Sequence, residues 1–319
     1  MSLSVLLTPA REPPVRPVRR VATCYSLFDA FFPQLGLFDL TEGLYDHPDT
    51  SFEQAQANQH NYLLDQIGCG PGFRVLDIGC GYGTLLKRAA DRGASGVGLT
   101  LSCEQAEQCQ AAGLEVSVLD YKALGPEWDC RFDGVVANGS LEHFAQPADA
   151  AAGRDDAVYR HLFHTVHRLL DPDSQARFVT TAIHFARRPD PGDITRHPLL
   201  ARPGSDAYHF ALLHRGFGGW YPVPGQLERC AEGYFELVDE VDGTEDYRGT
   251  SEEWLARARR TLGSLAGVRM LLQSVPVLLR HPVQYPTLLW CLLVSESWNW
   301  QFRPPAPTRL LRQTWKYRA

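Results

Sequence analysis

A glycine-rich segment, Asp77-Ile-Gly79-Cys-Gly81-Tyr-Gly83, is the feature of the sequence that points most directly to chemistry. It begins within a short apolar run at residues 74–79, which is typical of a buried strand, and it leads into a predicted helix. Glycine lets the backbone approach a ligand closely, and the N–H groups at a helix start attract an anion. A strand–helix turn without a ligand is the alternative, but this context favours a cofactor-binding loop.

Two classes of cofactor bind loops of this kind. Dinucleotide-binding loops have the spacing GxGxxG and an acidic residue about 20 positions later, at the end of the second strand, which binds the ribose. Here the spacing is GxGxG, and the second predicted strand ends at Leu99-Thr100 without an acid. Asp77, two residues before the first glycine, suits a ligand with a charged amino group. These features favour S-adenosylmethionine (SAM) over a dinucleotide.

The elements that must position this loop alternate along the chain. Apolar runs predict strands at residues 74–79, 95–100, 115–120, 132–139 and 176–183, and the intervening segments predict helices at 84–93, 102–113 and 158–170. Such alternation gives a parallel sheet covered on both faces, so we expect a doubly wound, Rossmann-like α/β fold. An earlier helix is predicted at residues 51–68, with Ser51 as its N-cap and Gly68 as its C-terminal stop.

The same patterns divide the chain into four segments. Residues 1–20 contain four prolines and four arginines, which is typical of a flexible arm. We interpret residues 21–68 as a helical N-terminal cap, 69–185 as the cofactor-binding α/β core, and 186–319 as a lid with closing strands and helices over a substrate pocket. Within the last segment the sequence predicts loops at 187–198 and 214–225, a strand at 234–243, a helix at 251–267 and a closing strand at 297–302.

Composition excludes several other classes of protein. The 319 residues are 44% hydrophobic and 21% charged, as in a folded globular chain, and the net charge of −6 argues against a nucleic-acid binder. Eight cysteines without a CxxC pair favour reduced thiols in the cytoplasm over a metal knuckle or a disulfide framework. The order of apolar and basic residues at the N-terminus is not that of a signal peptide. The apolar region at 275–294 is interrupted too often to span a bilayer.

Four motifs of the core occur in the same order as in a known family. The segments LDIGCGYG, GVGLTLSCEQ, LDY and ANGSLEHF, which begin at residues 76, 96, 119 and 137, resemble the cyclopropane fatty acid synthase family of SAM-dependent methyltransferases. That family includes the mycolic acid cyclopropane synthases, and the likeness extends from Tyr25 to about Trp300. The resemblance implies a class I methyltransferase sheet with a helical N-terminal segment and a C-terminal lid. It also implies SAM as cofactor and an apolar small molecule or lipid as substrate.

The resemblance assigns cofactor contacts residue by residue. The loop glycines would line the methionine part of SAM, with Asp77 positioning the loop or the amino group. Thr100 and Gln105 match a ribose-contacting threonine and glutamine, which accounts for the missing acid. Asp120 and Tyr121 would flank the adenine, although strand-end packing is an alternative for Tyr121. Asn138 and Gly139 would lie at the edge of the reacting centre. The full set is Asp77, Gly79, Gly81, Gly83, Thr100, Gln105, Asp120, Tyr121, Asn138 and Gly139.

The resemblance breaks down where the family binds bicarbonate. Members that form cyclopropanes hold this ion through a cysteine, a glutamate, a histidine and a tyrosine, and the ion removes a proton after methyl transfer. Glu142 and Tyr247 match the glutamate and the tyrosine. The cysteine position falls at Glu42 or Gly43, and the histidine position falls at Thr180 or Thr181. His184 lies nearby, but an odd offset on a strand points its side chain to the other face.

These changes alter the predicted chemistry. A carboxylate at Glu42 would repel bicarbonate, and two nearby glutamates raise one another's pKa, which suits a direct general base. His143, beside Glu142, is a further candidate base. The catalytic candidates are therefore Glu142, Tyr247, Glu42 and His143. We favour a glutamate carboxylate in place of the bicarbonate that the resemblance implies, and a remodelled pocket that holds bicarbonate through Glu142 and Tyr247 is the alternative. His161, His164 and His167 have helical spacing without an acidic or cysteine partner, so we expect no metal site.

We therefore expect methyl transfer from SAM to carbon of an apolar, unsaturated substrate, giving a cyclopropane or a methylated alkene. A small-molecule N- or C-methyltransferase of specialised metabolism is one alternative, because the family includes alkaloid N-methyltransferases. A SAM-fold protein that binds without turnover is another. The apolar region at 262–300 is either core and lid packing or a tunnel for a long apolar chain. A lipid-like substrate would also allow peripheral contact with a membrane.

Overall fold

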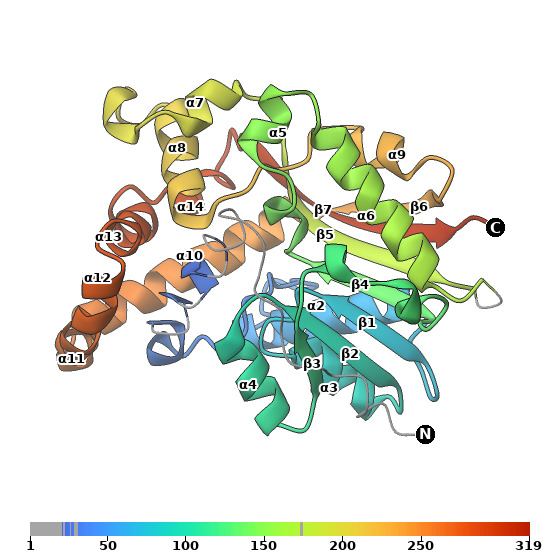
Figure 1. The fold of residues 1–319 in the computed structure, drawn as a ribbon. Coiled ribbons are helices and arrows are strands. Elements are labelled where there is room, and N and C mark those ends of the chain that lie inside the picture. Colours follow the sequence, from blue (N-terminus) through green and yellow to red (C-terminus); the bar gives the residue numbers. More distant parts are fainter. Residues whose placement is uncertain (1–20, 22, 26, 29–30, 173–174) are drawn as a thin grey trace.

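A seven-stranded sheet in the order β3-β2-β1-β4-β5-β7-β6 forms the centre of the molecule (Figure 1). The computed structural model describes residues 21–319 except 22, 26, 29–30 and 173–174, so the arm predicted at residues 1–20 lies outside the described residues. The strands are β1 (Arg74–Ile78), β2 (Ser95–Thr100), β3 (Glu115–Val118), β4 (Gly134–Asn138), β5 (Arg177–Phe185), β6 (Phe235–Asp242) and β7 (Thr308–Tyr317). The pairs among β1–β5 are parallel, whereas β7 runs antiparallel to both β5 and β6.

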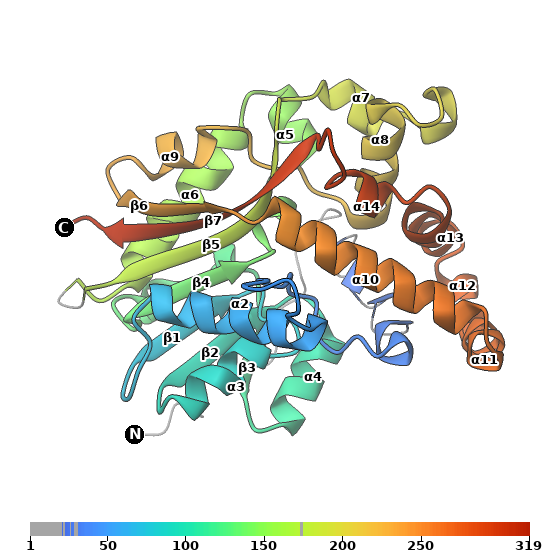
Figure 2. The same cartoon turned by 180° about the vertical axis from the view of Figure 1, so that it is seen from behind.

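Helices cover both faces of this sheet (Figures 1 and 2). On one face α2 (Phe52–Gln66), α3 (Thr84–Asp91) and α4 (Cys103–Ala111) share a buried cluster that includes Val75. On the other face α6 (Asp155–Leu169) packs in a cluster that includes Leu76. Successive side chains of a strand point to opposite faces, so a continuous apolar run such as β1 supplies both clusters. The doubly wound α/β fold expected from the sequence is confirmed.

N-cap side chains determine where two helices near the candidate site, α2 and α4, begin. The Ser51 side chain accepts a hydrogen bond from the backbone N–H of Gln54 at 3.2 Å, as predicted for an N-cap. Ser102 does the same for Gln105 at 3.2 Å and thereby starts α4 directly after β2. The helix that follows the glycine-rich loop begins after Gly83, whose φ of 73° is readily adopted only by glycine.

The remaining elements belong mainly to the second half of the chain. The α-helices are α5 (Pro147–Ala151), α7 (Pro191–Thr195), α8 (Asp206–Phe217), α9 (Gln226–Ala231), α10 (Thr244–Leu262), α11 (Leu265–Gln273), α12 (Val275–Arg280), α13 (Gln284–Leu289) and α14 (Ser297–Trp300). Short 3₁₀ segments are η2 (Phe32–Leu35), η3 (Tyr121–Ala123), η4 (Pro126–Trp128), η5 (Leu141–His143) and η6 (Pro198–Leu200), and η7 (Trp290–Val294) is a π-helix. Helices α11–α13 lie at the opposite end of the molecule from α9 and β6 (Figures 1 and 2).

Two predictions for this half are wrong. The segment 297–302 is not a closing strand, because it contains helix α14, and the closing strand is β7. The aromatic rings of that segment pack into helical surroundings: the ring centroids of Trp298 and Phe217 are 4.6 Å apart. The regions predicted as loops contain α7 and the end of α8.

Candidate active site

A cavity of about 460 Å³ opens at the carboxyl ends of β1, β2 and β4. This edge is where open parallel sheets bind their ligands. Every predicted site residue except Gly83 lines it. These residues are Glu42, Asp77, Gly79, Gly81, Thr100, Gln105, Asp120, Tyr121, Asn138, Gly139, Glu142, His143 and Tyr247. The topology thus brings together side chains that lie up to about 200 positions apart in the sequence.

The three loop glycines are required for different reasons. A Cβ on Gly81 would meet no described atom within 4 Å, and its φ is +51°, so its bare backbone faces open space in the cavity. A Cβ on Gly79 would meet the Ser140 Cβ at 2.8 Å, and one on Gly83 would meet the Leu114 Cδ1 at 2.5 Å. Gly83 therefore permits the packing of α3 and does not reach the cavity, whereas Gly81 leaves room for a ligand.

A buried acidic group lies below this loop. Burial raises the pKa of Asp77 to about 7; His60 opposes this rise and Asp39 adds to it. His60 Nε2 lies 2.7 Å from Asp39 Oδ2, and both residues line the cavity. The sequence analysis did not include Asp39 or His60 in the site. The only available signal was that His60 lies within the helix predicted at 51–68.

Two residues that line the cavity, Gln105 and Asn138, have buried polar atoms without a hydrogen-bond partner among the described residues. The Thr100 hydroxyl donates to Gln105 Oε1 at 2.8 Å, which leaves the buried Gln105 Nε2 without a hydrogen-bond partner among the described residues. Asn138 Nδ2 donates to the Thr41 hydroxyl at 2.8 Å, and Asn138 Oδ1 is likewise unpartnered. Buried polar atoms are rarely left unsatisfied, so these atoms indicate a polar ligand. Together with the open backbone at Gly81, they leave space and hydrogen-bonding groups for a polar cofactor such as SAM.

Glu142 lines the same cavity and has one carboxylate oxygen without a partner among the described residues. The backbone N–H of Ile183 donates to Glu142 Oε1 at 2.7 Å, whereas Oε2 is buried and has no partner among the described residues. Burial raises the pKa of Glu142 to about 7, against the hydrogen bond from Ile183, and the nearby Glu42 adds to the rise. A carboxyl group with a pKa near the working pH is well suited to act as a general base.

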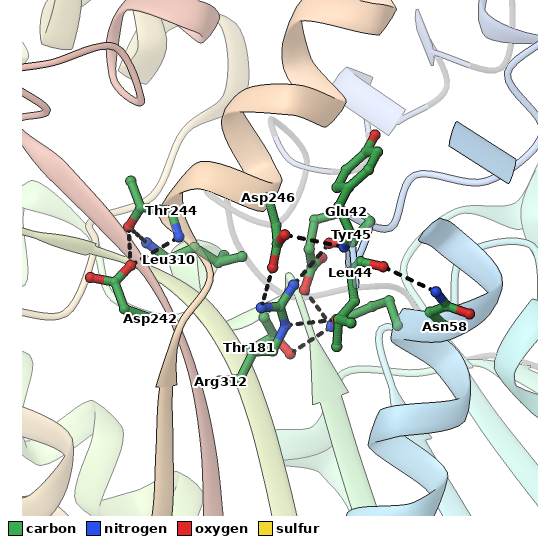
Figure 3. Close-up of polar contacts among 12 residues, drawn as sticks. Glu42, Leu44, Tyr45, Asn58, Thr181, Asp242, Thr244, Asp246, Leu310 and Arg312 are labelled. Carbon is green, nitrogen blue, oxygen red and sulfur yellow. Dashed lines mark hydrogen bonds and ion pairs between the residues drawn. The ribbon is translucent and has the colours of Figure 1, made fainter. Parts of the chain in front are cut away.

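Unlike Glu142, Glu42 takes part in a buried network of hydrogen bonds (Figure 3). Gln59 Nε2 donates to Glu42 Oε1 at 2.5 Å, and Arg312 Nε donates to Gln59 Oε1 at 2.7 Å. Arg312 is 1% exposed, and it also donates to Asp246 at 2.8 Å and to the Gly43 carbonyl at 2.8 Å. Burial raises the pKa of Glu42 and Arg312 opposes this rise. Sequence reasoning missed Gln59 and Arg312, because nothing local links residues that are 253 positions apart.

His143 and Tyr247 lie on the apolar side of the cavity. The Tyr25 hydroxyl and His143 Nε2 are 3.0 Å apart, and burial lowers the pKa of His143 to about 4, so its imidazole is neutral at pH 7. Tyr247 stacks on Phe302 with ring centroids 4.4 Å apart. Aromatic rings dominate this side of the lining, namely Tyr25, Phe28, Phe32, Phe217, Tyr221, Tyr247, Trp254 and Trp298.

The predicted histidine position holds no imidazole that faces the cavity. Thr181 Oγ1 accepts a hydrogen bond from Gln59 at 3.3 Å, and Thr180 Oγ1 accepts one from Trp315 at 3.0 Å. His184 is buried, and it does not line the cavity. In the described part of the chain no cluster of three or more His, Cys, Asp or Glu side chains could hold a metal ion.

The sheet order with its single antiparallel strand, the glycine-rich loop after β1 and the cavity at the strand ends define a class I SAM-dependent methyltransferase fold. The model of the family described as mycolic acid cyclopropane synthetase matches residues 15–264, and the chain belongs to this family. The family resemblance predicted from the sequence is confirmed.

Individual relatives agree with this assignment. A probable fatty acid methyltransferase of Mycobacterium tuberculosis is 36% identical over 111 residues, which cover 32% of this chain and only 25% of that relative. Cyclopropane mycolic acid synthase 1 of M. tuberculosis is 27% identical over 269 residues, which cover 81% of this chain and 86% of the relative. The solved structure of the cyclopropane synthase MmaA2 from M. tuberculosis superimposes with a TM-score of 0.71 at 21% identity, over 94% of this chain and 98% of that one.

Proposed function

We propose that this protein transfers a methyl group from SAM to a carbon atom of an apolar, unsaturated substrate and that Glu142 acts as the base. One observation carries this proposal. Glu142, whose buried Oε2 has no partner among the described residues, lines a cavity that has the cofactor loop on one side and an aromatic wall on the other. The names of the relatives, a fatty acid methyltransferase and a cyclopropane synthase, support a lipid-like acceptor.

Aromatic side chains and Glu142 would have different roles in the reaction. SAM supplies an electrophilic methyl group, and transfer of that group to a carbon–carbon double bond leaves a positive charge on the substrate. The faces of Tyr247, Trp254 and Trp298 stabilise this charge by cation–π interaction and exclude water from it. Glu142 Oε2 accepts the proton that the substrate loses, and the electron pair of the broken C–H bond closes a double bond or a three-membered ring.

A bicarbonate ion does not fit the residues that surround Glu142. The resemblance puts Glu42 or Gly43 where the family has a cysteine and Thr180 or Thr181 where it has a histidine, and Glu42 adds a second carboxyl group to the cavity lining beside Glu142. An anion bound beside two carboxyl groups would be repelled. We therefore derive no step through bicarbonate and assign the proton to Glu142 itself.

The lining also restricts the charge of the substrate. Lys122 is the only Lys or Arg side chain among the described residues that line the cavity, and it lies over the ring of Tyr121 on the cofactor side. A substrate that buried a phosphate or carboxylate group would need a cationic partner, because an unpaired buried charge is costly. We infer that the part of the substrate that enters the cavity is neutral and apolar.

Transfer of label into an organic phase tests this proposal. The protein is incubated with SAM that carries a radiolabelled methyl group and with dispersed unsaturated fatty acyl lipids or isoprenoids. We expect label to move into the organic extract only in the presence of protein. Label that moves to amine acceptors, and to none of the apolar ones, would favour the N-methyltransferase alternative. Binding of SAM without any transfer to either class would favour the non-catalytic alternative.

A further inference from the structure

Helices α11–α13 and the π-helix η7 carry exposed apolar side chains and lie at one end of the molecule (Figures 1 and 2). We call these side chains the helical patch. Its most exposed members are Leu265, Leu279 and Leu272, at 89%, 76% and 68%. The full set is Leu265, Val268, Leu271, Leu272, Val275, Leu279, Val283, Trp290 and Val294. So many exposed apolar side chains within residues 265–294 are unusual on a protein that meets only water.

The charge of the helical patch differs from that of the whole chain. The protein has a formal net charge of −6, yet residues 263–295 contain no aspartate or glutamate. They contain two arginines, Arg269 and Arg280, and both side chains are exposed. Apolar side chains next to cationic ones without any acid form the composition of a helix that lies in the surface of an anionic bilayer.

The helical patch adjoins a second cavity that borders the cavity of the active site. A second, smaller cavity of about 60 Å³ lies between α10, α11 and α13 and is lined almost entirely by apolar side chains. It shares Phe28, Trp254 and Trp298 with the first cavity. Leu271 lines this second cavity and is also 45% exposed, so the outer surface and the second cavity meet at α11.

We propose that the helical patch docks on the surface of a membrane that contains anionic lipids, and that the substrate enters from the bilayer through the second cavity. The route of entry rests on the function proposed above, whereas the docking does not. In the described residues no single helix is long and apolar enough to cross a membrane, whereas the bent pair Thr244–Leu262 and Leu265–Arg280 could do so by length and composition only. The proposal places these helices in the membrane interface. Burial of the leucine side chains provides the affinity, and the two arginines pair with lipid phosphates.

Flotation with lipid vesicles tests the docking without any need for activity. The full chain is mixed with vesicles of equal parts phosphatidylcholine and phosphatidylglycerol and centrifuged through a density gradient. We expect the wild-type protein to float and a Leu272→Glu/Leu279→Glu variant to remain at the bottom. A Val238→Glu/Val241→Glu variant is the matched control, because it changes the charge equally at exposed valines of β6, at the other end of the molecule. This control should float like the wild type.

Charge variants distinguish the contribution of the helical patch to vesicle binding from that of the arginines in residues 1–20. Exchange of Arg269 and Arg280 for glutamine should weaken binding by about fivefold for each arginine, and added salt should weaken the wild type likewise. Glutamine at Arg11, Arg16, Arg19 and Arg20 should leave much of the binding intact. The proposal is overturned if the wild type does not float, if the Leu272→Glu/Leu279→Glu variant floats equally well, or if binding follows only the N-terminal arginines. It is also overturned if the wild type is a dimer that this variant converts to a monomer, because a second copy would then cover the patch.

Failure of docking and failure of the proposed function give different results. Leu272 and Leu279 line neither cavity, so the Leu272→Glu/Leu279→Glu variant should keep wild-type turnover on substrate dispersed in detergent. It should lose turnover on the same substrate embedded in vesicles. Equal turnover of both proteins on embedded substrate would contradict entry from the bilayer.

Discussion

Replacement of Glu142 by glutamine is expected to lower turnover by about 10²–10⁴-fold, the usual effect of losing a general base. Glutamine keeps the acceptor oxygen for the Ile183 N–H, so the position of the side chain and the affinity for SAM should change little. Because the pKa of Glu142 is raised to about 7, wild-type turnover should rise with pH through neutrality as the carboxyl group ionises. The Glu142→Gln enzyme should lack this rise. Steady-state kinetics across pH 5.5–8.5, with SAM affinity by calorimetry, provides the measurement.

Two controls make the result specific. Glu42→Gln removes the neighbouring carboxyl group that raises the pKa of Glu142, so the rise in turnover should shift to lower pH. Depletion of bicarbonate from degassed buffer should leave the wild-type rate unchanged, and a strong bicarbonate dependence would contradict the role given to Glu142. A fully active Glu142→Gln enzyme would show that the substrate requires no base, as in transfer to a nucleophilic nitrogen.

The same substitution should also change stability in a pH-dependent way. The pKa of Glu142 in the folded protein is higher than its ordinary value of 4.5, so the folded state binds this proton more tightly than the unfolded state does. The stability contributed by this group is present below about pH 4.5 and is lost as pH rises towards 7. Glu142→Gln should therefore melt at a higher temperature than the wild type at pH 8, and the difference should disappear near pH 4.5. This behaviour would show that loss of activity is not loss of folding.

Substitution of Gly81 by valine is expected to abolish SAM binding. The Cβ of valine would project into space that no described atom occupies and that we assign to the cofactor. Valine also resists the φ of +51° at this position, so a matched control for backbone strain is needed. Gly113→Val provides it, because Gly113 has a φ of +79° and open space around it but does not line the cavity. Calorimetry should show unchanged SAM affinity for Gly113→Val, and unchanged affinity for Gly81→Val would refute the site.

The first half of the fold could be predicted because local signals and the overall topology agree there. Strand β2 has the bounds predicted from its apolar run, and Ser51 caps α2 as expected. In a parallel sheet the carboxyl ends of the strands meet at one edge, so residues after β1, β2 and β4 had to share a site.

The second half and the network around Glu42 could not be predicted in this way. The segment 297–302 alternates aromatic and polar residues like a strand, but the packing of Trp298 against Phe217 is compatible with a helix, and tertiary contacts decide the outcome. Strand β7 has to be placed between β5 and β6, and only long-range pairing specifies that position. Arg312 and Gln59 meet for the same reason, since β7 and α2 come together only in the folded chain.

The position of deuterium in the product tests the central claim most directly. The enzyme is supplied with SAM whose methyl group carries three deuterium atoms and with the apolar acceptor that takes up label, and the product is analysed by fragmentation mass spectrometry. We expect deuterium on carbon: a methylated alkene retains three deuterium atoms and loses one proton of the substrate, whereas a cyclopropane retains two and loses one deuteron of the transferred methyl group. A deuterated methyl group on nitrogen or oxygen, or a product without deuterium, would contradict the proposed transfer to carbon.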